Sequence, residues 1–96
     1  MQRVGCVYIL SNQFHTVLYI GVTANLVARI HQHRNKIDPG SFTAKFNCSK
    51  LLYYESFPRI EEAITREKQM KRWKREWKRR LIQQMNPAWI DLFDTL

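Results

Sequence analysis

Apolar and polar positions alternate in two short segments near the start of the chain. Residues 6–10 and 18–23 have the two-residue period and the aromatic and β-branched content of strands, and a short polar loop, residues 11–16, joins them. The pattern predicts a β-hairpin. Because side chains alternate between the faces of a strand, Tyr8 and Tyr19 can lie side by side on one face. Two half-buried strand tyrosines without a chemical role would give the same pattern.

The next segment predicts a helix whose inner face carries polar residues. Thr23 is a candidate N-cap, and the helical period runs from about residue 24 to about residue 35. A buried arginine is costly unless it meets an anion or a partner, so Arg29 is a candidate binding residue. An arginine at the rim and a hydrogen-bonded, half-buried His33 are the alternatives. The stripe consists of Leu26, Arg29, Ile30 and His33.

Spacing argues against a structural zinc site. His31 and His33 are two residues apart and point to different sides of a helix. Cys6 and Cys48 do not form a chelating pair. We expect both cysteines to be free thiols in a reducing compartment.

The middle of the chain predicts a loop followed by a third strand. Residues 37–49 form the longest irregular stretch, with a turn at Asp38-Pro39-Gly40. Residues 51–57 are apolar enough for a central strand, and Pro58 ends it. A loop of this length in a small domain is often functional.

From Ile60 the apolar residues follow a helical period that continues to Met85 without glycine or proline. The pattern alone allows one long helix, but a rod of about 40 Å would outrun a domain of this size, so we favour two helices. Asn86-Pro87 ends the helical region, and residues 88–93 predict a last turn that packs on the body of the domain.

Glu67 lies on the apolar stripe of this region, where leucine or isoleucine is expected. A carboxylate on a core-facing stripe needs a partner, and a divalent cation and Arg29 are both candidates. A rim glutamate paired with a neighbouring lysine or arginine is the alternative.

Composition narrows the class of protein. The chain has 96 residues, enough for one domain with one modest core, and its 45% hydrophobic content argues against disorder. No apolar run is long enough to span a membrane or to act as a signal peptide, so we expect a cytoplasmic protein. The net charge of +8 favours a nucleic-acid partner. Nine of the sixteen lysines and arginines lie between residues 66 and 80, and a solvated helical face would explain them equally well.

Residues 7–10 (Val-Tyr-Ile-Leu) and 18–23 (Leu-Tyr-Ile-Gly-Val-Thr) resemble the paired signature of the GIY-YIG nuclease superfamily, in its branch of small single-domain members. The first half departs from the motif, because Cys6-Val7-Tyr8 stands where Gly-Ile-Tyr is usual. The resemblance continues through Arg29, His33 and Glu67 to the basic C-terminal region.

The resemblance implies an α/β fold, with a small three-stranded, mostly antiparallel sheet flanked by helices in the order β-β-α-β-α-α, in one domain spanning residues 1–96. It implies that Glu67 binds Mg²⁺ or Mn²⁺ and that Arg29 holds the scissile phosphate. It makes Tyr8 the residue that activates the attacking water, with Tyr19 beside it. A tyrosine has a pKa of about 10, so we expect nearby positive charge, or a relay through His33, to assist Tyr8.

The sequence and the resemblance therefore predict a metal-dependent endonuclease that hydrolyses DNA phosphodiester bonds. Structured or damaged DNA is the expected substrate, as in DNA repair. RNA as a substrate and a protein partner are left open. A binding module of the same fold that does not cut is the alternative, and an adaptor protein is a third interpretation. The intact set of candidate catalytic residues favours the enzyme. The expected nucleic-acid contacts are Thr43, Lys45, Lys68, Lys71, Arg72, Lys74, Arg75 and Lys78.

Overall fold

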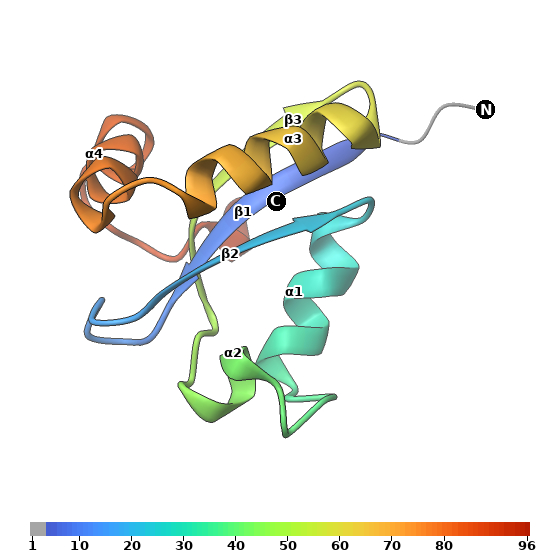
Figure 1. Cartoon of the computed structure of the whole chain (residues 1–96). Helices are drawn as coiled ribbons and strands as arrows, with labels where there is room; N and C mark the ends of the chain where they lie inside the picture. The colour runs from blue at the N-terminus through green and yellow to red at the C-terminus, as the bar shows by residue number, and fades with distance from the viewer. Residues whose placement is uncertain (1–3) are drawn as a thin grey trace.

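The central strand of the sheet, β1 (Gly5–Ser11), pairs antiparallel with both of its neighbours. The computed structural model describes residues 4–96, and its strand order is β2-β1-β3, with β2 spanning Leu18–Thr23 and β3 spanning Lys50–Phe57 (Figure 1). Every residue of β1 is buried. The three-stranded antiparallel sheet with flanking helices confirms the predicted α/β fold.

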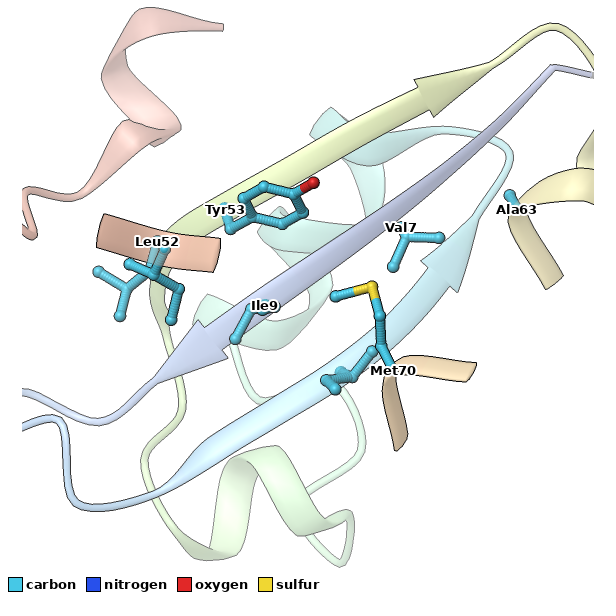
Figure 2. Close-up of a cluster of buried hydrophobic side chains, with 8 residues drawn as sticks. Val7, Ile9, Leu52, Tyr53, Ala63 and Met70 are labelled. Atoms are coloured by element: carbon cyan, nitrogen blue, oxygen red, sulfur yellow. The ribbon is translucent and has the colours of Figure 1, made fainter. Parts of the chain in front are cut away.

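One face of the sheet packs against α3 (Ile60–Lys71) and α4 (Arg75–Met85). Figure 2 shows this cluster, with Val7 and Ile9 of β1 on the same face as Met70 of α3. A β-bulge in the pairing of β1 with β3 places the consecutive residues Leu52 and Tyr53 in this one cluster. The apolar side chains on this face of the sheet are therefore buried under α3 and α4.

The other face of the sheet packs against α1 (Leu26–Arg34), which contributes the buried Ile30. The predicted cap is wrong by two residues, because Asn25 and not Thr23 accepts the hydrogen bond from the N–H of Ala28. The Thr23 hydroxyl instead accepts from the N–H of Asn25, 3.1 Å away, so it holds the cap in place.

The stretch predicted to be irregular contains a short helix, α2 (Phe42–Lys45). The Ser41 hydroxyl caps it by accepting from the N–H of Ala44. This single turn orients the side chains of residues 42–45 with respect to α1, and two of the four are buried.

The helical region after Pro58 forms two helices, as predicted. α3 ends at Lys71 and α4 begins at Arg75, without a glycine or proline between them. Met70 and Ile82 are both fully buried in the same cluster. A straight helix would carry Ile82 about 18 Å beyond Met70, so the chain must turn to bury both residues against one sheet.

The segment after α4 packs back onto the sheet, as expected. The Asn86 amide donates to the carbonyls of Leu52 and Ile90, and a short 3₁₀ helix, η1 (Leu92–Thr95), follows. The Asp91 carboxylate pairs with Arg34 of α1 and accepts from the N–H of Leu51. Within residues 4–96 no helix has the length and apolar content needed to cross a bilayer.

Gly21 of β2 lies opposite Tyr8 of β1 and leaves room for its ring. A Cβ atom at this position would lie 2.3 Å from the Tyr8 hydroxyl oxygen, and the buried ring cannot move away. We predict that Gly21→Ala lowers the free energy of unfolding by about 1–3 kcal/mol, measured by chemical denaturation. Gly40→Ala is the matched control, because its nearest heavy atom is 3.7 Å away. Equal stability of the two variants would contradict this packing.

Candidate active site

The Tyr8 hydroxyl is buried between the sheet and α1. The ring is only 1% exposed, and the hydroxyl end lies over Gly21 on the edge strand β2. There the hydroxyl oxygen is 2.9 Å from Nε2 of His33 on α1. A residue with a larger side chain than Gly21 would occupy this path, so the glycine of the second strand permits the contact.

His33 is held at both ring nitrogens. Its Nδ1 atom is 2.8 Å from the Thr43 hydroxyl on α2, and Ser41 lies 3.3 Å beyond that hydroxyl. Thr43 is 3% exposed and lines the same cavity as Arg29, and its contact with nucleic acid stays a prediction. Its side chain turns inward because α2 faces α1, and it orients the imidazole ring.

Burial sets the protonation state of His33. Desolvation, with a further contribution from the positive charge of Arg29, lowers the pKa of His33 to about 4. The ring is therefore neutral at pH 7, with one nitrogen that donates and one that accepts. We assign the proton to Nδ1, because Arg29 beside Tyr8 can only donate, which directs the Tyr8 proton toward Nε2 of His33.

Burial is also the largest influence on the pKa of Tyr8. Desolvation raises the pKa of Tyr8 to about 12, although Arg29 acts in the opposite direction. The positive charge of Arg29 therefore does not bring the pKa of Tyr8 below its usual value, which leaves the relay through His33 as the expected assistance. A fully buried phenol and imidazole both favour their neutral forms.

Tyr19 and Arg29 line an open cavity of about 150 Å³ beside the buried pair. The Tyr19 ring lies 6.3 Å from the Tyr8 ring and 5.6 Å from that of His33, measured between centroids. Arg29 is exposed, and its guanidinium donates to the Gln32 side chain. The two tyrosines are side by side as predicted, and Arg29 presents its charge at the mouth of the cavity.

Glu67 belongs to α3, which packs on the face of the sheet opposite to α1 (Figure 1). Its side chain is 14% exposed and pairs with Lys71 at 3.4 Å. After burial and Tyr19, its negative charge is a further cause of the raised pKa of Tyr8. The lysine pair is the alternative that the sequence left open, and it leaves part of the carboxylate accessible.

A single carboxylate suits a hard cation that keeps most of its water ligands. Among the residues that the structure describes, no three histidine, cysteine, aspartate or glutamate side chains gather into a metal-binding group. Mg²⁺ is commonly held by one or two carboxylates together with water and substrate phosphate oxygens. Glu67 therefore fits a cation of this type, and a cation fully enclosed by protein ligands does not fit this site.

The predicted basic contacts separate into three groups. Lys71 and Lys78 line a second cavity, of about 320 Å³, together with Tyr19. Arg75 is exposed and donates to the carbonyl of His15 in the hairpin loop. The remaining basic residues are exposed on α2, on α3 and at the turn before α4, namely Lys45, Lys68, Arg72 and Lys74.

Sequence reasoning missed Phe42, which lines both cavities. Its ring stacks on that of Tyr19, with the centroids 5.9 Å apart. Ser41 before it is a helix-capping residue and was the available signal for α2. Nothing in the local pattern indicates that Phe42 meets the second strand, because that contact depends on how α2 packs.

The low pKa of His33 makes stability depend on pH in a defined direction. The unfolded chain takes up a proton near pH 6.5 and the folded protein only near pH 4, so the stabilisation is complete above pH 6.5 and is lost as pH falls toward 4. We predict that over this window the free energy of unfolding falls by on the order of 2–3 kcal/mol more in the wild type than in His33→Gln. His31→Gln, which removes an exposed imidazole, is the control. Parallel pH profiles for wild type and His33→Gln would overturn the assignment.

Comparison with known proteins identifies the family of the chain. A family model described as the GIY-YIG catalytic domain matches residues 4–80, a range that includes all five candidate catalytic residues. Neither the search of curated proteins nor the search of solved structures gives a match. The matched range covers most of the chain, and the strand order, the paired tyrosines and the carboxylate of α3 all lie within it. The chain therefore belongs to the GIY-YIG family of nuclease-type domains.

Proposed function

We propose that this protein is a metal-dependent endonuclease that hydrolyses phosphodiester bonds of DNA. One observation carries the proposal. A buried Tyr8 hydroxyl, hydrogen-bonded to neutral His33, lies beside a cavity that is open to solvent and lined by Arg29 and Tyr19. Phosphodiester hydrolysis needs a proton acceptor for water and positive charge at the phosphate, and this cavity offers both.

The proton transfer begins from neutral Tyr8 and neutral His33 and passes through no separate tyrosinate. As water attacks phosphorus, its proton passes to the Tyr8 oxygen while Tyr8 passes its own proton to Nε2 of His33. A tyrosinate with a pKa of about 12 is then never formed as a separate species. The Nδ1–H group of His33, donating to Thr43, supports the imidazolium that results.

Substrate binding strengthens His33 as a base. Besides burial, the charge of Arg29 lowers the pKa of this histidine. A phosphate bound by the guanidinium would offset that charge, and the basicity of His33 would rise at the moment it is needed. Arg29 thus has two functions, to hold the scissile phosphate with its fork of donors and to couple binding to proton transfer.

Glu67 is the residue that would hold Mg²⁺ or Mn²⁺. When bound, the cation would neutralise charge on the phosphate and assist the departing oxygen. Lys71 forms an ion pair with the Glu67 carboxylate, so this pair must break or share the carboxylate with the cation. Tyr19, beside Tyr8, is placed to orient water or a phosphate oxygen.

The basic surface supports DNA as the substrate. Lys71 and Lys78 lie in the cavity next to that of Arg29, and the exposed cations of α2, α3 and the turn before α4 extend the positive surface. Contacts of this type hold the phosphate backbone with little sequence preference. The buried free thiols of Cys6 and Cys48 suit a reducing compartment, which supports action in the cytoplasm.

Nicking of supercoiled plasmid tests the proposal. We expect the wild type to nick in Mg²⁺ or Mn²⁺ and to be inactive in EDTA, and we expect Glu67→Gln to slow nicking by about 100-fold or more. Glu62→Gln is the control, because Glu62 is an exposed residue of the same helix and should tolerate the change.

Two results would contradict the enzyme assignment of Glu67. One is nicking by Glu67→Gln at the wild-type rate, and the other is equal nicking with and without a divalent cation. If the wild type cuts neither plasmid nor branched, nicked or single-stranded DNA but binds them in a salt-sensitive manner, the protein is a binding module.

A further inference from the structure

We propose that Phe42, supported by Tyr19, is a stacking platform for an unpaired nucleobase next to the phosphate that is cut. The inference rests on the proposed function and extends it, because it specifies the form of DNA that the site accepts. It concerns a side chain outside the set of residues discussed for catalysis.

Phe42 is held in place and yet left open. Its ring stacks on Tyr19 with an angle of 28° between the planes, and Phe46 packs against it with the centroids 4.7 Å apart. Despite these contacts Phe42 is 47% exposed. A large apolar ring that is fixed by neighbours and retains a free surface has the properties of a base-stacking residue.

The position of Phe42 links the candidate active site to a second cavity. Phe42 and Tyr19 both line the cavity of about 150 Å³ that contains Arg29 and His33. The same two rings line the neighbouring cavity of about 320 Å³. A nucleotide whose phosphate lies at Arg29 can therefore place its base against Phe42 in the adjoining space.

The lining of the second cavity matches a nucleotide better than an apolar or acidic protein segment. Leu18 and Ile20 provide an apolar wall beside the ring of Phe42, and Lys71 and Lys78 provide positive charge. A base needs a flat apolar contact, and its backbone needs cations. Among the described residues, those that line this cavity include Lys78 and Lys71, the latter paired with Glu67 outside the lining, and no aspartate or glutamate, so the lining favours an anionic ligand.

A base in continuous duplex DNA is stacked on both faces and cannot also stack on Phe42. Only a base that is single-stranded, frayed or extruded presents a free face, and unstacking costs least where pairing is already lost. The expected substrates are accordingly single strands, branch points and ends, in preference to intact duplex.

The proposal is tested by removing the Phe42 ring from the protein and the base from the DNA, separately and together, and comparing the affinities. Three dye-labelled ligands of equal length are compared by fluorescence anisotropy in EDTA: oligothymidylate, a chain of abasic phosphodiester units, and a duplex. The proteins are the wild type, Phe42→Leu, Phe42→Trp and Phe14→Leu. Leucine keeps apolar bulk but removes the ring, and Phe14, 77% exposed in the hairpin loop, provides the matched control.

We expect Phe42→Leu to weaken binding of oligothymidylate by about fivefold or more while binding of the abasic chain and of the duplex stays unchanged. Phe42→Trp should restore the affinity, because tryptophan supplies a larger π surface. Phe14→Leu should match the wild type on all three ligands. Circular dichroism of each variant verifies that the fold is retained.

Two results would overturn the platform: wild-type affinity of Phe42→Leu for oligothymidylate, or an equal loss for oligothymidylate and the abasic chain. The binding assay contains no divalent cation, so it is independent of cleavage. If the base-dependent effect is seen but no DNA is cut, the platform is supported and the proposed endonuclease function is contradicted. If DNA is cut but no base-dependent effect is seen, the proposed function is supported and the platform is contradicted.

Discussion

The buried hydrogen bonds from Tyr8 through His33 to Thr43 join the central strand to α1 and α2. Polar groups buried at this depth must be paired, because each unpaired group costs about 1–3 kcal/mol. The position of β1, the rotation of α1 and the single turn of α2 are therefore constrained together. Gly21 is part of the same constraint, since its missing side chain is the space that the Tyr8 hydroxyl occupies.

The same burial determines what the site can do. It raises the pKa of Tyr8 and lowers that of His33, so the two groups meet as neutral donor and neutral acceptor at pH 7. The charged residues, Arg29 and Glu67, lie nearer the solvent and approach from opposite faces of the sheet. In the proposed mechanism, this arrangement keeps proton transfer in the interior and leaves phosphate and cation binding at the surface, where a large anionic substrate can reach them.

Sequence periodicity was sufficient for the strands and the paired tyrosines, because each depends on apolar residues at regular spacing. The division of the last helical region followed instead from its length and from the family resemblance, because its periodicity also fits one long helix. Periodicity located Arg29, His33 and Glu67 as polar residues on apolar stripes. It failed where the outcome depends on packing between elements. The stretch expected to be irregular contains the short helix α2, which turns Thr43 toward His33. The raised pKa of Tyr8 could not be predicted either, because proximity to Arg29 can be inferred from spacing, whereas the degree of burial of Tyr8 cannot.

The protonation state of His33 is the most direct test of this account. Nitrogen-15 NMR of the imidazole reports which nitrogen carries the proton and whether the ring is charged. The account predicts a neutral ring with the proton on Nδ1 at pH 6, and a titration midpoint near pH 4. A charged imidazolium at pH 6, or a neutral ring with its proton on Nε2, would contradict the proposed relay from Tyr8 to His33.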